Sequence, residues 1–125
     1  MSEENRPWPT EVRLAKDRRT LTVTFDSGAA HAFPAEFLRV LSPSAEVQGH
    51  NPDQKQTVPG KMNVEIMGVE PVGNYAVRLQ FDDLHSTGIY SWDYFLKLAN
   101  EREELWSQYL NELEEKGLAR EPARM

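Results

Sequence analysis

Residues Val64 to Trp92 read Val-Glu-Ile-Met-Gly-Val-Glu-Pro-Val-Gly-Asn-Tyr-Ala-Val-Arg-Leu-Gln-Phe-Asp-Asp-Leu-His-Ser-Thr-Gly-Ile-Tyr-Ser-Trp. Large apolar residues alternate here with small or polar ones, which is the pattern of a strand with one face buried. The inward face is predicted to carry Tyr75, Val77, Leu79 and Phe81. A turn is expected at 71–74, because Pro presets φ and Gly or Asn tolerates positive φ. Chemistry, if the chain has any, is expected in the polar loop 82–88.

Working outward, the preceding segment predicts the partner strand of this hairpin, in which Gly68 indicates a bulge. Nearer the N-terminus, Leu21, Val23 and Phe25 alternate with threonines and predict a strand over 20–25. Shorter strands are expected over 11–14 and 30–33. The sequence therefore predicts an α+β fold with an antiparallel sheet of about five strands, one short helix after the third strand and one long C-terminal helix.

The short helix is expected to start at Pro34 and to end before Ser42-Pro43-Ser44. Arg39 on this helix is more often a solvated charge than a ligand. The following 19 residues, 42–60, contain three prolines and few aliphatic residues. Such a long connection is typical of a mobile or functional segment, and we expect it to be mobile with Val47 as an anchor.

The final helix is predicted to run from Trp92 to about Lys116, with Ser91 as its N-cap and Gly117 after its end. A helix of about 25 residues is about 37 Å long, which exceeds the width of a domain of this size. Its second half either overhangs the sheet or folds back on the first hairpin. In the first case an exposed apolar patch would bind a partner or a second copy of the chain, as a homodimer, through Trp106, Tyr109 and Leu110.

Composition limits the function. The 125 residues predict one domain over 10–117, flanked by a flexible arm, 1–9, and a disordered polar tail, 118–125. Trp8 in the arm is expected to dock on the domain. The absence of cysteine excludes disulfides and thiol ligands and favours a reducing cytoplasm. A net charge of −6 argues against nucleic-acid binding, and we recognise neither a signal peptide nor a membrane span.

The three histidines give little support for catalysis. They are His31, His50 and His85, and none lies three or four residues from another. Asp82, Asp83 and His85 could together bind a divalent cation, iron or zinc, although an acidic turn with an internally bonded histidine is the simpler interpretation. No Gly-x-Ser-x-Gly segment or phosphate-binding glycine loop occurs, so no enzyme activity is predicted.

Four segments resemble the gamma-butyrobetaine hydroxylase-like N-terminal domain. They are Trp8-Pro9-Thr10-Glu11-Val12-Arg13-Leu14, Glu36 to Val47, Glu70 to Val77, and Phe81-Asp82-Asp83-Leu84-His85-Ser86-Thr87-Gly88-Ile89-Tyr90-Ser91-Trp92. The resemblance covers about Trp8 to Leu98. It implies an α+β domain without independent activity, found in front of 2-oxoglutarate dioxygenase domains, fused to P-loop ATPases of iron–sulfur assembly, or alone in bacterial proteins of uncharacterised function.

In the hydroxylases of that family, this domain binds a structural zinc through three cysteines and a histidine. The matching positions here are Ser42, Ser44, approximately Val47, and His85. Hydroxyl and isopropyl groups do not replace thiolates, so the resemblance does not carry the zinc site to this chain. The family also commonly has Gly where this chain has Leu84, and a larger residue makes a turn with positive φ less favourable there.

These observations together predict a non-catalytic binding or adaptor module, which the resemblance links to iron–sulfur or metal cofactor assembly or to a dioxygenase-like system. The expected contact surface combines Arg39, Ser42, Ser44 and the loop from Asp82 to Tyr90. The expected partner is a P-loop ATPase of iron–sulfur assembly. A metal-binding protein that uses His85 with the nearby carboxylates is the alternative.

Overall fold

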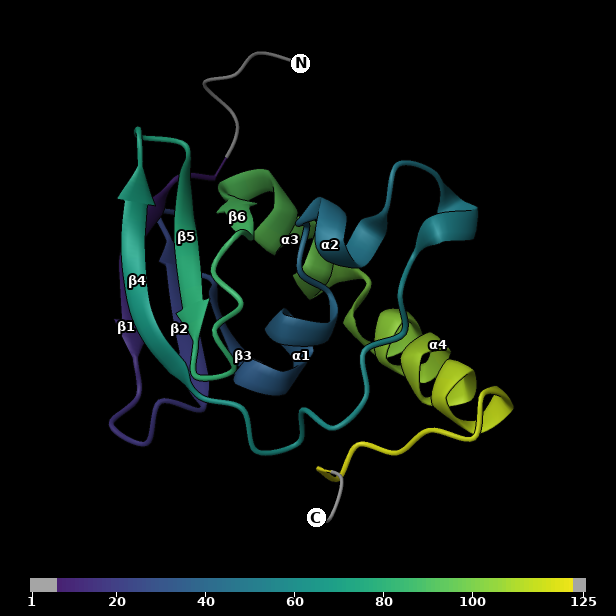
Figure 1. Ribbon diagram of the computed structural model, residues 1–125. Helices are drawn as coiled ribbons and strands as arrows, with labels where there is room; N and C mark the ends of the chain where they lie inside the picture. Colours follow the sequence, from purple (N-terminus) through teal and green to yellow (C-terminus); the bar gives the residue numbers. More distant parts are fainter. Residues whose placement is uncertain (1–6, 123–125) are drawn as a thin grey trace.

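The computed structural model describes residues 7–122, and Figure 1 shows its arrangement. The elements follow one another as β1 (Pro9–Leu14), β2 (Thr20–Phe25), β3 (Ala30–Pro34), α1 (Ala35–Val40), α2 (Ala45–Gln48), η2 (Pro52–Gln54), β4 (Ile66–Val72), β5 (Ala76–Phe81), β6 (Ile89–Ser91), α3 (Trp92–Asn100) and α4 (Arg102–Glu115). The predicted α+β class is confirmed.

The strands form two antiparallel sheets of three strands each, β1-β2-β3 and β4-β5-β6, where the sequence predicted a single sheet. The sheets lie in two layers, with helices covering the open side of the core (Figure 1). The connection from β3 to β4 carries α1, α2 and η2, so the chain returns on the opposite side of the core and not beside β3. The predicted bulge occurs between Ile66 and Gly68.

The core confirms most of the predicted strand faces. Leu21, Val23 and Phe25 from β2 meet Leu79 and Phe81 from β5 in one apolar cluster. Tyr75 was assigned to the wrong side, since 54% of it is exposed. The reason is the position of the turn. It lies at 73–75, so Tyr75 belongs to the turn and the buried face of the strand begins at Val77.

The C-terminal helix differs from its prediction, because it is broken at Glu101. Ser91 caps α3 as predicted, accepting a hydrogen bond from the Tyr94 amide at 3.1 Å, and Gly117 has a positive φ of 66° after α4. The break allows Arg102 to reach β3, where Nη1 donates to the Ala32 carbonyl at 2.7 Å. The second half of the apolar stripe therefore turns onto the domain and does not overhang it.

The segments predicted to be irregular carry more structure than expected. Within 42–60, Ser44 caps α2 and Val47 is buried, as expected of an anchor. Residues 118–122, which were predicted to be part of a disordered tail, bond to the 60–62 segment. At the other end, Trp8 is 49% exposed and is held by its backbone to Asp26. The remaining predictions for 1–6 and 123–125 lie outside the described residues.

Candidate functional site

The loop 82–88 after β5 is held closed by its own backbone. The Leu84 amide donates to the Phe81 carbonyl at 3.0 Å, and the Phe81 amide donates to the His85 carbonyl at 2.9 Å. Asp83 tightens this turn, since its Oδ1 accepts from the His85 amide at 3.0 Å. The turn requires a positive φ of 73° at Leu84, a conformation that ordinary side chains rarely adopt. The backbone of the loop is therefore fixed, at the expense of strain at one residue.

Asp83 lies at the centre of a partly buried ion-pair cluster. Its Oδ2 accepts from Arg39 Nε at 2.7 Å and lies 2.6 Å from Lys61 Nζ. Burial by itself would raise the pKa of Asp83, but the hydrogen bonds from Lys61, the His85 amide and Arg39 together lower it to about 2. The expectation of a solvated Arg39 was wrong, because only 11% of its side chain is exposed. Asp82 has no part in the cluster and accepts instead from the Glu65 amide.

His85 is held between the segment that follows α1 and the helix α2. Its Nε2 lies 2.9 Å from Ser42 Oγ and its Nδ1 lies 3.1 Å from Glu46 Oε2. Burial, followed by the charge of Arg39, lowers the pKa of His85, so the ring is neutral at pH 7 in spite of its carboxylate neighbour. A carboxylate can only accept, so Nδ1 carries the hydrogen and Nε2 accepts from the Ser42 hydroxyl. Both ring nitrogens are thus occupied.

This order of contacts, Ser hydroxyl to His Nε2 and His Nδ1 to a carboxylate, is that of a catalytic triad. The surroundings do not suit catalysis, however. Ser42 is fully buried, and its Oγ also accepts from the Ser44 amide at 3.3 Å. Gly88 covers it so closely that an added Cβ would lie 2.5 Å from Ser42 Oγ. A nucleophile must reach its substrate, so we interpret this cluster as a structural one.

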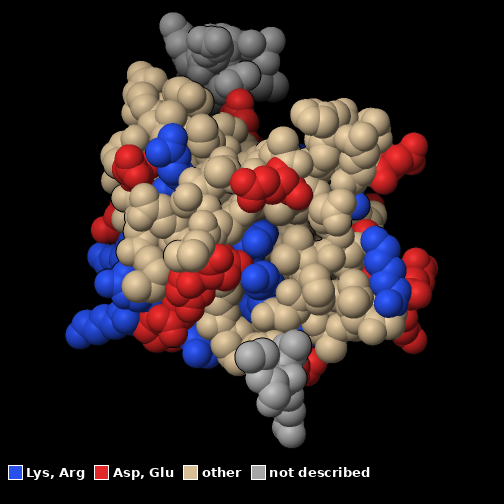
Figure 2. All heavy atoms as spheres, viewed as in Figure 1, with Lys and Arg blue, Asp and Glu red and all other residues tan. Residues whose placement is uncertain are grey.

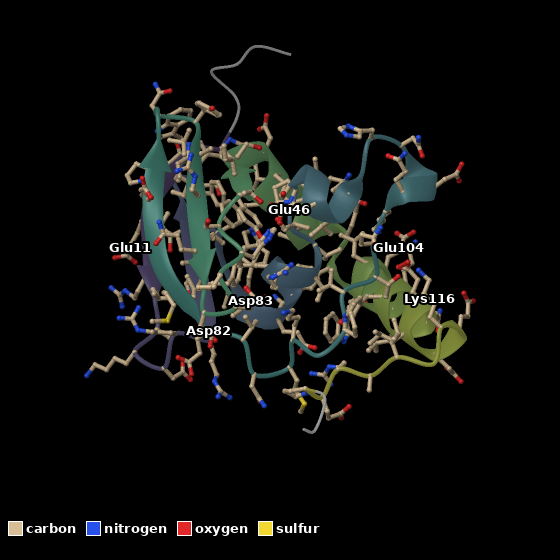
Figure 3. The ribbon with its side chains drawn as sticks, in the orientation of Figure 1. Glu11, Glu46, Asp82, Asp83, Glu104 and Lys116 are labelled. Atoms are coloured by element: carbon tan, nitrogen blue, oxygen red, sulfur yellow. The ribbon has the colours of Figure 1, made fainter. Side chains whose placement is uncertain are left out.

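Figure 3 places Glu46 and Asp83 between β5 and the helices α1 and α2, with Asp82 at the end of β5. The loop 82–88 is thereby connected to α1 through Arg39 and to α2 through Ser44, whose Oγ lies 2.7 Å from Thr87 Oγ1. These connections join segments about forty residues apart in the sequence. The cluster fixes the loop against both helices.

Comparison with known proteins identifies the relatives of this domain. A family model described as gamma-butyrobetaine hydroxylase-like, N-terminal, matches residues 12–96. The chain belongs to this family. Two NMR solution structures are similar over almost the whole chain: one has 46% identity and a TM-score of 0.78, covering 95% of this chain and 94% of that one. The other has 42% identity and a TM-score of 0.80, covering 99% and 92%.

A third similar structure is a crystal structure of a protein of unknown function of the DUF971 family from Acidithiobacillus ferrooxidans. It has 37% identity and a TM-score of 0.61, and it covers 73% of this chain and 91% of that one. A search of curated proteins finds no match. The expected resemblance to the gamma-butyrobetaine hydroxylase-like domain is therefore confirmed.

The predicted metal site is not supported. Among residues 7–122 no three His, Asp or Glu side chains form a group that could hold a metal ion. The Asp83 carboxylate is already paired with the side chains of Arg39 and Lys61, and both ring nitrogens of His85 are hydrogen-bonded to protein atoms. Of the positions that the family resemblance equates with zinc ligands, three lie together, since Ser42 bonds to His85 and to the Ser44 amide. This chain has hydrogen-bonded hydroxyl groups at positions where the zinc site of the family has thiolates. The residues present therefore do not fit zinc.

The predicted partner-binding residues are mostly interior. Ser42 and Tyr90 are fully buried, Ser44 is 8% exposed, and the Tyr90 hydroxyl donates to the Leu38 carbonyl. On α4, Tyr109 is 4% exposed and Trp106 lies against Phe37, which leaves Leu110, 38% exposed, as the accessible member of its trio. Neither the Ser42–Ser44 corner nor the helix offers the expected contact surface. No helix within the described part of the chain is long and apolar enough to span a bilayer.

The cluster predicts a specific loss of stability in acid. The pKa of His85 is lower in the folded than in the unfolded chain, so unfolding takes up a proton, and the free energy of unfolding falls as the pH drops below about 6.5. Asp83, with a pKa of about 2 against an ordinary 3.8, contributes about 2–3 kcal/mol that is lost as the pH falls through that interval.

Urea unfolding followed by circular dichroism at pH 8, 5 and 3 measures both effects. The His85→Gln variant is the control for the upper interval, because it keeps His31 and His50 but cannot titrate at position 85. A wild-type chain that loses no more stability between pH 8 and 5 than this variant would contradict the neutral state of His85.

Proposed function

We propose that this domain is a non-catalytic protein-binding module whose contact surface is centred on Leu84. The observation that carries the proposal is that Leu84 is 89% exposed while its backbone is held at a φ of 73°. A left-handed conformation costs a residue with a Cβ about 1–2 kcal/mol. Because its side chain is exposed, Leu84 makes no packing contacts within the described part of the chain that would offset this conformational cost. Such local strain is typical of functional sites, where the surrounding structure imposes it.

The surroundings of Leu84 suit an apolar contact. A hollow of about 450 Å³ lies beside it and is lined by Met67, Gln80, Phe81, Asp82, Leu84 and Ser86. Met67 is 51% exposed, so two flexible apolar side chains border the hollow. On the face seen in Figure 2, acidic and basic side chains are interspersed, without a continuous field of one sign. Burying a leucine side chain contributes about 1.5–3 kcal/mol, enough to make Leu84 a main contributor to binding.

The proposed partner is a P-loop ATPase of iron–sulfur cluster assembly. This choice rests on the family, whose domains are fused to such ATPases, and it replaces the metal-binding alternative. A dioxygenase-like partner is the second candidate from the same resemblance. In either case iron would be held by the partner, and this domain would contribute a rigid apolar contact.

Titration of the isotope-labelled chain with a purified P-loop ATPase of iron–sulfur assembly from the same organism tests the proposal. We expect amide signals of residues 80–88 and of Met67 to shift or broaden. Leu84→Asp should weaken binding at least tenfold, because the charge would have to be desolvated. Tyr75→Ala is the control: it removes an exposed aromatic at the turn, at the other end of β5. Equal effects of the two substitutions, or no binding, would overturn the proposal.

Leu84→Gly separates stability from binding. Glycine adopts positive φ without steric cost, so we expect this variant to be more stable than the wild type by about 1 kcal/mol in urea unfolding. The same variant lacks the apolar side chain and should bind the ATPase more weakly. A variant that is both more stable and equally tight in binding would show that Leu84 is not a contact residue.

A further inference from the structure

The segment that follows α4 folds back along the domain. Gly117 turns the chain, and the segment runs from the end of α4 back toward the long connection that precedes β4 (Figure 1). There the Gly60 amide donates to the Ala119 carbonyl at 2.9 Å, and the Met62 amide donates to the Arg120 carbonyl at 3.0 Å. The backbone carbonyls of Ala119 and Arg120 thus bond to the 60–62 segment, although neither segment is a strand.

Arg120 is the anchor of this segment. Its Nε and Nη2 donate to the two oxygens of Glu36 at 2.8 and 2.7 Å, and its guanidinium carbon lies 5.3 Å from the centre of the Trp106 ring. Only 8% of the Glu36 side chain is exposed. A planar, bidentate guanidinium stacked on an indole is a contact that lysine cannot reproduce. Glu36 and Trp106 therefore form a subsite specific for arginine.

The rest of the segment contributes little burial. Of residues 117–122, all but Arg120 are exposed. Beside the anchor remains a hollow of about 380 Å³, lined by Pro34, Glu36, Phe37, Arg102, Glu103, Trp106 and Arg120, which the segment does not fill. The segment is held by two backbone bonds and by one half-buried side chain, Arg120, whose partner Glu36 is buried. Extended peptides bind in grooves in a similar way, with the backbone supplying affinity and the pocket specificity.

We propose that the groove between α1, α4 and the 60–62 segment is a binding site for an extended, arginine-containing segment of a partner protein, which residues 118–122 occupy in its absence. The chain's own Leu-Ala-Arg-Glu-Pro acts as an intramolecular competitor, and its tethering gives it a high effective concentration. A partner segment displaces residues 118–122 because it also fills the hollow beside the arginine subsite, which those residues leave empty. This site is separate from the contact at Leu84.

The test uses a fluorescent peptide with the sequence of residues 117–122, Gly-Leu-Ala-Arg-Glu-Pro, and full-length chains. Fluorescence anisotropy should show the peptide binding to the Arg120→Ala chain at least ten times more tightly than to the wild type. Replacing the arginine of the peptide by lysine, or adding Glu36→Gln to the chain, should each weaken binding at least tenfold. The Leu84→Asp chain should bind this peptide as the wild type does, which separates this proposal from the preceding one.

Arg120→Lys serves as the control for correct folding of the variants, because it keeps a cation beside Glu36. The wild type is measured in parallel. In the wild-type chain, millimolar peptide should move the amide signals of residues 119–121 toward unstructured positions, while those of Gly60 and Met62 stay hydrogen-bonded. Binding that does not distinguish arginine from lysine, or no displacement in the wild type, would overturn the proposal. A dimer that exchanges its C-terminal segments, detected by sedimentation, would assign the groove to a second copy and not to a partner.

Discussion

Replacing Asp83 by alanine is expected to lower the free energy of unfolding by about 3–5 kcal/mol. The side chain neutralises Arg39, which is 11% exposed and whose Nη1 is buried without a hydrogen-bond partner among the described residues. Removing the carboxylate would leave that guanidinium charged and desolvated next to Lys61. It would also delete the bond to the His85 amide that closes the loop. Urea unfolding at pH 7 measures the loss.

The matched control is Asp82→Ala, one residue away. Asp82 is exposed and accepts a single hydrogen bond, from the Glu65 amide at 3.2 Å, so its loss should cost about 1 kcal/mol. The double variant Asp83→Ala, Arg39→Met removes both charges and should recover most of the stability, as replaced buried ion pairs do. Equal losses in the free energy of unfolding for the two aspartate variants would show that the ion-pair cluster stabilises the fold no more than the exposed hydrogen bond of Asp82 does.

These two aspartates also show where sequence reasoning ends. They are adjacent and chemically identical, and the sequence placed both in one acidic turn with His85. Arg39 determines which of them is buried, and it lies 44 residues away. Periodicity reports which side of a strand is apolar, which is why Leu79 and Phe81 were predicted correctly. It carries no information about which charges from distant segments meet.

The prediction of one continuous C-terminal helix was wrong for a related reason. No Pro or Gly interrupts 92–116, so the sequence indicates one continuous helix. The helix breaks at Glu101, and the next residue, Arg102, contacts the Ala32 carbonyl and the rings of Phe33 and Phe37. Likewise, residues 118–122 have the composition of a polar tail, but Arg120 and two backbone hydrogen bonds hold them on the domain. A single long-range contact of this kind leaves no periodic trace.

The candidate site stays a prediction, but the structure shows how its residues are arranged. The sequence selected the loop 82–88 and the Ser42–Ser44 corner, and the structure brings these together through His85. The polar groups were expected to face a partner or a metal, whereas they form hydrogen bonds and ion pairs with one another. The signal that sequence reasoning undervalued was Leu84 in a position where the family commonly has glycine. Its positive φ turns that departure into the most informative feature of the loop.

Phe95→Ala is expected to cost about 3–5 kcal/mol, because Phe95 is a fully buried aromatic residue that contacts both sheets. Its ring is fully buried, with its centre 5.6 Å from that of Phe33 in the first sheet and 5.7 Å from that of Tyr90 in the second. Each sheet has three strands, and residues of both sheets lie in the same apolar core cluster. A cavity at this point would weaken both sheets together, so urea unfolding should stay a single transition at a lower midpoint.

The contrast is Tyr75→Ala, at the residue that the strand pattern wrongly placed inside. Its side chain is more than half exposed at the hairpin turn, so the loss should stay within about 0.5 kcal/mol. A large cost at Tyr75 would reinstate the predicted face of the strand and move the turn back to 71–74. A small cost at Phe95 would mean that the two sheets and α3 do not share one core, and the loop at Leu84 would then lack the rigid support that the proposed contact requires.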